Sequence, residues 1–149
     1  MKNLLFILTF LVLLSSCSDV YREFKKFDDL KWDKNDVKTF EVNINKDGEY
    51  DLFFALRHYT GYPFTTLKIE VTQIAPNGRA SSKKIEIPVA DENGKYIGDV
   101  SGELWDVENK IAEKVFLEKG KYTFKIAHYM NSNPVILVVD IGLIIRISN

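Results

Sequence analysis

Apolar and polar residues alternate with a period of two along most of the chain from residue 39 onward. In the first such run, Phe40, Val42 and Ile44 alternate with polar neighbours, which is typical of a half-buried strand. Turn-forming residues at 45–48 and 76–78 separate the runs. The pattern predicts strands at residues 39–44, 50–56, 67–72, 85–89, 111–117, 122–126 and 135–147.

Strands joined by short turns, without a convincing long amphipathic helix, favour an all-β fold. We expect an antiparallel β-sandwich of about eight strands, of jelly-roll or immunoglobulin-like type, with a closed barrel as the alternative. Both faces of residues 50–56 are apolar, which predicts a central strand that is covered on each side. Pro88 cannot donate to a ladder and therefore predicts that residues 85–89 form an edge strand.

The run at 135–147 is the most apolar one after the N-terminal segment. It is rich in β-branched Val and Ile, and it contains Asp140 and Arg146. It is also shorter than the ~20 apolar residues that a membrane-spanning helix needs. We therefore expect a long buried strand with a kink or bulge near residues 140–142.

The N-terminal segment is ordered like a bacterial lipoprotein signal. Lys2 precedes an apolar segment at 4–14, which is too short to span a membrane, and Leu14-Ser15-Ser16 leads into Cys17, the only cysteine. We predict a signal peptide at 1–16, cleavage before Cys17, and lipidation of its thiol as a membrane anchor. The alternatives are an ordinary secretory signal with an incidental cysteine and a buried N-terminal helix.

Residues 17–31 are predicted to be the lipidated cysteine and a tether, and residues 32–149 the β-sandwich domain. The tether is polar and charged, but Tyr21, Phe24 and Phe27 recur every three residues. That spacing suits one or two helical turns or a segment laid across the domain.

Charge and cysteine count argue against several function classes. Removal of Lys2 with the signal takes the formal net charge from −1 to −2, so we expect no basic surface for nucleic acid. With Cys17 lipidated, the mature domain has no thiol for a disulfide, a nucleophile or a metal site. Gly-x-Ser-x-Gly, phosphate-loop and His-Glu-x-x-His motifs are absent from the sequence. We therefore expect a non-enzymatic protein without cofactor, metal or small-molecule substrate.

Two sets of residues still invite a chemical interpretation. His58 and His128 suggest a metal or acid–base pair, but no acidic residue is placed to complete it, so half-exposed histidines are the preferred interpretation. Asp91, Glu92 and Asp99 lie on a loop rich in Gly and Asn and offer oxygens suited to Ca²⁺. Their spacing does not match a calcium-binding loop, which favours solvated turn residues.

Two predicted loops carry large side chains that form a candidate contact surface. These residues are Tyr59, Tyr62, Phe64, Tyr129 and Met130. If both loops lie at one end of the sandwich, they form an apolar patch suited to protein or sugar contact. The alternative is that the side chains fold back as lids on the core. A glycan-binding module is the second functional hypothesis, because these tyrosines and Tyr96 offer flat rings to a sugar.

Several short motifs occur in an order that resembles one protein family. The earlier ones are Trp32 with Asp36, Tyr50-x-Leu52, Leu56-Arg57, Tyr62-Pro63-Phe64, Leu67 and Pro76-Asn77-Gly78. The later ones are Asp91-x-x-Gly94-Lys95-Tyr96-x-Gly98, Gly120-x-Tyr122-x-Phe124-x-Ile126, Met130 and Asp140-Ile141-Gly142-Leu143. Together, behind the signal with its cysteine, they resemble the gliding-motility lipoprotein H (GldH) family of the Bacteroidetes over most of the mature chain. Tyr96 stands where Trp is expected, and no basic residue flanks Met130.

The resemblance implies a small, non-enzymatic lipoprotein of the cell envelope that is associated with gliding and with the type IX secretion apparatus. It implies partners among the other envelope proteins of that machinery, reached through loops or an edge strand. By the same analogy, the anchor is expected in the outer membrane, with the domain on the periplasmic face.

Overall fold

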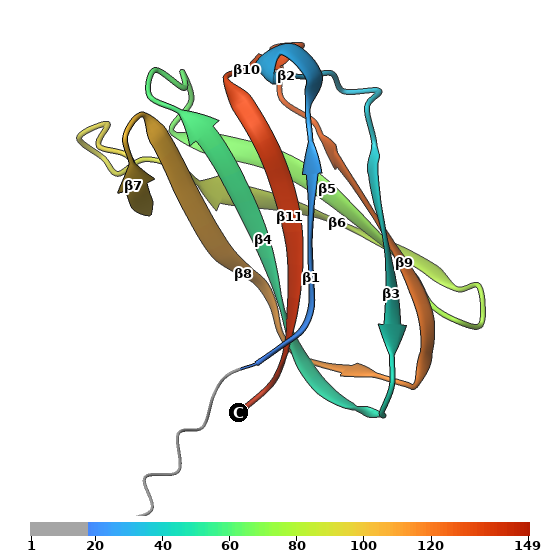
Figure 1. The fold of residues 1–149 in the computed structure, drawn as a ribbon. Coiled ribbons are helices and arrows are strands. Elements are labelled where there is room, and N and C mark those ends of the chain that lie inside the picture. Colours follow the sequence, from blue (N-terminus) through green and yellow to red (C-terminus); the bar gives the residue numbers. More distant parts are fainter. Residues whose placement is uncertain (1–17) are drawn as a thin grey trace, which may run out of the picture.

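The computed structural model describes residues 18–149, so the predicted signal peptide and Cys17 lie outside the described residues. Figure 1 shows two antiparallel sheets that pack face to face. The strands are β1 (Asp19–Lys26), β2 (Lys31–Trp32), β3 (Lys38–Ile44), β4 (Gly48–Tyr59), β5 (Thr66–Ile74), β6 (Ala80–Pro88), β7 (Asp99–Ser101), β8 (Leu104–Leu117), β9 (Gly120–His128), β10 (Val135–Ile136) and β11 (Val138–Ile147). A single 3₁₀ turn, η1 (Asp28–Leu30), separates β1 from β2. Within residues 18–149, no helix is long and apolar enough to cross a membrane.

The strand order identifies the type of sandwich. The five-stranded sheet has the order β1-β11-β4-β8-β7, the four-stranded sheet has the order β3-β9-β5-β6, and β2 pairs with β10 in a small ribbon. Among the eight long strands, the first pairs with the last, the second with the seventh, the third with the sixth, and the fourth with the fifth. This nesting describes one long hairpin rolled into two sheets, which is a jelly roll. The predicted all-β sandwich is confirmed, and the jelly-roll alternative is the one observed.

The core lies between the two sheets and consists of the apolar residues of the alternating runs. Phe40 of β3, Phe54 of β4 and Phe124 of β9 are fully buried there. Burial of one large apolar side chain contributes about 1.5–3 kcal/mol, so the alternation explains which face of each strand turns inward. The central position of β4 is confirmed as well, because Ala55 on its outer face is also buried.

The predicted tether is wrong for residues 19–26, which form β1, so the folded domain begins before residue 32. β1 pairs with β11 along its length, from Asp19 opposite Arg146 to Lys26 opposite Asp140. It is an edge strand, and charged residues on an edge strand discourage pairing with other chains. Those same charges hide the strand from a search for apolar alternation.

The spacing of the aromatic residues in β1 has a different cause from a helix. Successive side chains of a strand point to opposite faces, so Tyr21 and Phe24 separate. Tyr21 packs against the core, whereas the ring of Phe24 lies over Gly142 on the outer face of the five-stranded sheet. Phe27 follows the strand and stacks on Trp32, with ring centroids 5.0 Å apart.

The C-terminal run contains the predicted irregularity. It divides into β10 and β11 at Leu137, whose φ is 63°. The register of β11 against β4 then shifts between Val138 and Asp140. This bulge turns the strand from the small ribbon into the centre of the five-stranded sheet.

Two strands are longer than the pattern predicted. β6 pairs only with β5 among the described residues, as Pro88 predicted. It begins at Ala80, and alternation did not reveal this start because the first five residues are exposed and polar or small. Residues 104–110, whose pattern is ambiguous, join 111–117 in β8. A bulge at Lys114, where φ is 50°, interrupts the alternation of β8.

Candidate functional site

The two loops that carry the candidate contact residues lie at the same end of the sandwich, where β4 and β9 end (Figure 1). Tyr62 and Met130 are buried, with 3% and 9% of their surfaces exposed. Tyr59, Phe64 and Tyr129 are half-buried. Of the two interpretations that the sequence left open, Tyr62 and Met130 follow the second, because they are lids on the core and not part of an open patch.

Hydrogen bonds and ring contacts hold these loops inward. The ring of Tyr62 lies 4.9 Å from that of His58 and 5.7 Å from that of Phe64. The hydroxyl of Tyr96 donates to the Tyr62 carbonyl oxygen and accepts from the Gly61 N–H, each at 2.9 Å. These bonds fix Tyr96 as part of the loop packing, which leaves it less suited to stack on a sugar.

The two histidines belong to separate clusters and are both buried. His58 contacts the rings of Tyr62 and Tyr96, whereas His128 packs edge-on against Trp32 at 5.2 Å. Each ring N–H donates to a carbonyl oxygen at 3.0 Å: His58 Nδ1 to Tyr59 and His128 Nε2 to Trp32. Burial lowers the pKa of both histidines below the usual value. Both are therefore neutral core residues, and the preferred interpretation of half-exposed side chains is wrong.

The loop carboxylates have a structural role in a turn. Asp91 Oδ1 accepts hydrogen bonds from the N–H groups of Asn93 and Lys95, each at 2.9 Å, and so shapes the turn. Asp99 lies apart from Asp91, in β7, opposite Asp106 of β8. Among residues 18–149, no three His, Cys, Asp or Glu side chains are close enough together to hold a metal ion.

The outer face of the five-stranded sheet carries a row of charges that crosses every strand. Lys26, Asp140, Arg57, Asp106 and Asp99 are successive cross-strand neighbours on β1, β11, β4, β8 and β7. Arg57 and Asp106 form a two-pronged pair, with Nε–Oδ1 and Nη2–Oδ2 distances of 2.7 and 3.2 Å. Both side chains of this pair are partly exposed, so the row is accessible from outside the fold.

Asp140 is the least solvated member of this row. Only 4% of its surface is exposed, and Oδ1 has no hydrogen-bond partner within the described chain. Burial raises the pKa of this carboxyl, and Arg57 opposes that rise. A buried, unpaired carboxylate costs free energy, so burial at this position favours the protonated, neutral form of Asp140.

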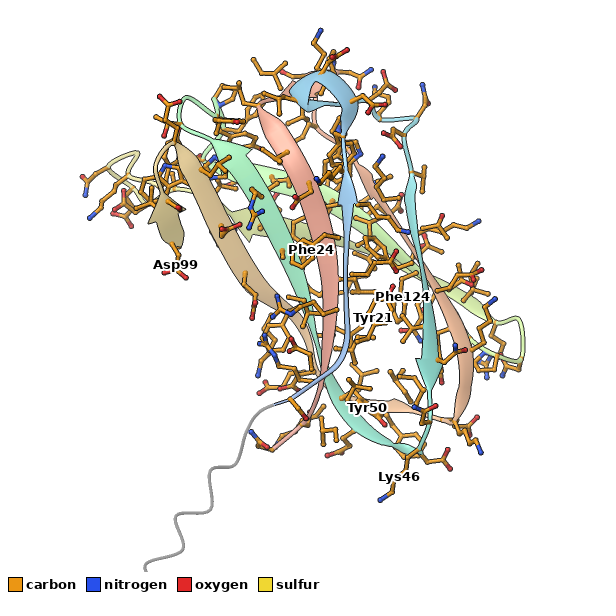
Figure 2. The ribbon with its side chains drawn as sticks, viewed as in Figure 1. Tyr21, Phe24, Lys46, Tyr50, Asp99 and Phe124 are labelled. Carbon is orange, nitrogen blue, oxygen red and sulfur yellow. The ribbon has the colours of Figure 1, made fainter. Side chains whose placement is uncertain are left out.

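A depression of 370 Å³ lies beside the charged row. Its lining comes from Arg22, Phe24, Ala55, Arg57, Gly98, Asp99, Asp106, Val107 and Glu108. Gly98 permits the close approach of its loop, because a Cβ there would lie 2.1 Å from the carbonyl oxygen of Asp106. The depression thus joins an aromatic ring, two arginines and three carboxylates on one exposed sheet face. Figure 2 shows Phe24 and Asp99 on opposite sides of this face.

A second, different feature lies between the two sheets, along one side of the sandwich. The free edge of β6 borders an apolar groove of 340 Å³ between β6 and β8. Leu52, Val71 and Phe124 contribute to its walls, together with Ser81, Ser82 and Lys83 of the edge strand itself. Lysine on an edge strand discourages strand addition, so the groove is the weaker candidate for a docking site.

The charged face could not be found from the sequence alone. Arg57, Gly98, Asp140 and Gly142 each belong to a motif that carries the family resemblance, but they are scattered along the chain. The register of the five-stranded sheet brings them onto or beside one surface. The signal that would have helped is the pairing of β1 and β7 with this sheet, and neither strand was predicted.

Comparisons with known proteins agree with this pattern of motifs. The sequence profile of the family described as "GldH lipoprotein" matches residues 19–145, which is nearly the whole described chain. The chain belongs to the GldH lipoprotein family. It is 30% identical over 132 residues to the "Gliding motility lipoprotein GldH homolog" of Christiangramia forsetii, covering 86% of this chain and 81% of that protein. It is also 30% identical over 128 residues to "Gliding motility lipoprotein GldH" of Flavobacterium johnsoniae, covering 84% and 79%.

Membership in the GldH family makes the chain a membrane-anchored lipoprotein of the cell envelope. Solved structures resemble it only distantly. A carbohydrate-binding module of the type CBM28, specific for non-crystalline cellulose, has a TM-score of 0.46 and 11% identity, covering 86% of this chain and 73% of the module. A likeness at that level carries no functional argument.

Proposed function

We propose that this GldH-type lipoprotein is a non-enzymatic component of the envelope that supports gliding motility and type IX secretion by contacting other envelope proteins. The anchor in this proposal is a lipid on Cys17, in the outer membrane, with the domain on the periplasmic face. The family match supports the gliding role. The secretion role and the membrane assignment extend that match by analogy.

The outer face of the five-stranded sheet is the contact surface in this proposal. The observation that carries it is the combination of Arg22, Phe24 and the Arg57–Asp106 pair around one depression. Aromatic and arginine side chains are enriched at protein interfaces, where they contribute most of the binding energy. Phe24 is 40% exposed, so its ring is available to a partner.

Gene deletion followed by complementation tests the proposal. Loss of the gene is expected to reduce both colony spreading and protein secretion, and the unaltered gene is expected to restore them. The variant Arg22→Glu reverses an exposed charge at the rim of the depression. It should restore neither trait, although the protein reaches normal amounts in the membrane.

Lys121→Glu is the matched control, because Lys121 is also an exposed basic residue of a strand that forms a surface ion pair. It lies on β9 in the four-stranded sheet and should restore both traits. Normal spreading and secretion in the deletion strain would overturn the function. Equal behaviour of the two variants would instead overturn the choice of surface.

A glycan ligand is the second candidate. The residue that supports it is the exposed Phe24 and no longer the tyrosines. An exposed ring beside an arginine and carboxylates offers both stacking and hydrogen bonds to a sugar. A glycan array probed with the mature domain tests this candidate. Binding that disappears in Phe24→Ala would favour the glycan, and an array without binding would remove it.

A further inference from the structure

The chain leaves almost no length between the proposed anchor and the first strand. Only Ser18 separates Cys17 from Asp19, the first residue of β1. Two residues of extended chain span at most about 7 Å. The headgroup layer on each side of a bilayer is about 5–8 Å thick. If Cys17 is lipidated, as the proposed function holds, the start of β1 therefore lies at the surface of the lipid headgroups.

Several other segments reach the same end of the sandwich as the start of β1. Figure 1 shows there the end of β11, the turn between β3 and β4, and the turn between β8 and β9. Asp19 pairs with Arg146 of β11, and the Ser148 N–H donates to the Glu49 carbonyl oxygen at 3.0 Å. The Lys119 N–H donates to Asp47 Oδ1 at 2.6 Å, which joins the two turns. This end, named here the anchor end, is thus one connected surface.

The anchor end also exposes apolar side chains. Phe116 near the end of β8 and Ile147 at the end of β11 are 62% and 59% exposed, more than any other large apolar residue in the described chain. They lie on the two strands that flank β4, opposite Glu49 and Tyr50 respectively. Phe116 and Ile147 thus give the anchor end exposed apolar area, and interfacial membrane binding grows with the apolar area that it buries.

Charge at the anchor end is mixed. Lys46 and Lys119 are exposed beside the carboxylates of Asp47 and Glu118. Figure 2 shows Lys46 at the tip of this end. A mixed surface gains little from anionic lipid, so apolar contact and the short connection to the anchor dominate.

We propose that the anchor end of the sandwich rests on the lipid headgroups, with Phe116 and Ile147 inserted into the interfacial layer. The strands then run away from the membrane, and the outer face of the five-stranded sheet is displayed sideways to neighbouring proteins. The aromatic loops at the other end point away from the bilayer. This orientation rests on the lipid at Cys17 but not on the choice of protein partner.

Fluorescent labelling of the acylated full-length protein tests this orientation. Because acylation occupies Cys17, one introduced cysteine can be labelled selectively. Phe116→Cys and Ile147→Cys place an environment-sensitive dye at the anchor end. Ile136→Cys is the matched control, since Ile136 is 44% exposed and lies at the opposite end in β10. Each protein is reconstituted in phosphatidylcholine vesicles that contain lipids with a nitroxide quencher near the headgroup.

Quenching at 116 and 147, but not at 136, is the expected result, and added phosphatidylglycerol should not change it. Vesicle-bound protein without quenching at 116 and 147 would overturn the orientation while leaving the lipid anchor intact. Protein that fails to bind vesicles would overturn the anchor itself. A flexible Gly/Ser insert between Ser18 and Asp19 should weaken the quenching, and unchanged quenching would refute the role of the short connection.

Discussion

The two ends of the jelly roll differ in the exposure of their apolar side chains. At the end where β4 and β9 finish, Tyr62 and Met130 turn inward and are almost fully covered. At the anchor end, Phe116 and Ile147 project outward. Both pairs consist of large apolar residues in or next to turns. The residue type alone therefore does not determine whether the side chain covers the core or is exposed to solvent.

The length of the covering chain explains the difference. The inward-folded end has long connections at residues 60–65, 89–98 and 129–134, and the β2–β10 ribbon closes over it. The anchor end has short turns, at 45–47, 75–79 and 118–119, beside its exposed residues. A loop residue becomes buried where enough chain exists to cover it, and it stays exposed where the connection is short.

Trp32 provides the strongest test of this comparison. It is fully buried at the covered end, stacks on Phe27 and donates from Nε1 to the Asp36 carbonyl oxygen at 2.9 Å. We expect Trp32→Ala to lower the free energy of unfolding by about 3–5 kcal/mol, because a large cavity remains. Urea unfolding of the soluble domain measures this. Val37→Ala, at an exposed site nearby, is the control and should cost less than about 0.5 kcal/mol.

Two substitutions of Tyr62 distinguish the contribution of its packed ring to stability from that of its buried hydroxyl. Its hydroxyl is buried without a hydrogen-bond partner within the described chain, and burial raises its pKa. Tyr62→Ala should cost roughly 3 kcal/mol through lost packing. Tyr62→Phe keeps the ring and removes the unpaired group, so it should be neutral or stabilising by up to about 1 kcal/mol. A strong loss of stability in Tyr62→Phe would show that the hydroxyl has a partner in solution.

The buried histidines give the covered end a dependence on pH. Their pKa values are lowered by burial, so below about pH 6.5 the unfolded chain binds protons that the native chain does not. Proton uptake therefore stabilises the unfolded chain as pH falls. The free energy of unfolding decreases by at most about 1.4 kcal/mol per pH unit for each neutral histidine. Unfolding curves between pH 7.5 and pH 5 measure the slope. His58→Phe should make it shallower, and an unchanged slope would contradict a neutral buried His58.

Asp140 is expected to change stability with pH in the opposite direction to the histidines, which provides a check on the measured slope. Its raised pKa means that the native chain holds a proton at a pH where the unfolded chain has lost it. Stability from this residue therefore falls as pH rises from about 4 through the raised pKa. Asp140→Asn should remove this contribution and increase stability near neutral pH. A decrease at neutral pH would show that the charged carboxylate makes a favourable contact.

Alternation in the sequence was sufficient to predict most of the sandwich. Runs such as the one with Phe40, Val42 and Ile44 have one apolar face, and burial of that face fixes their orientation. β1 was missed because Arg22, Glu23, Lys25 and Lys26 obscure its two-residue period. An edge strand owes its place to a single partner, and that partner, β11, lies at the other end of the chain.

The candidate surface was less accessible to sequence reasoning than the fold. Its charged row is created by strand register, which joins residues as distant as Lys26, Arg57 and Asp140. No local pattern specifies that register before the β1–β11 pair is known. The sequence left open whether the two aromatic loops share one end of the sandwich. Their exposure depends on the length of chain that covers them, which alternation does not report.

The smallest expected effect belongs to the anchor end. Phe116 is 62% exposed, although it borders a shallow cleft with Arg79 and Tyr122. Replacement by serine should therefore change the free energy of unfolding of the soluble domain by less than about 0.5 kcal/mol. The same change should weaken quenching of a label at residue 147 in vesicles, because the interfacial contact loses apolar area. A large loss of stability in solution would mean that chain covers the ring, and the contrast between the two ends would then fail.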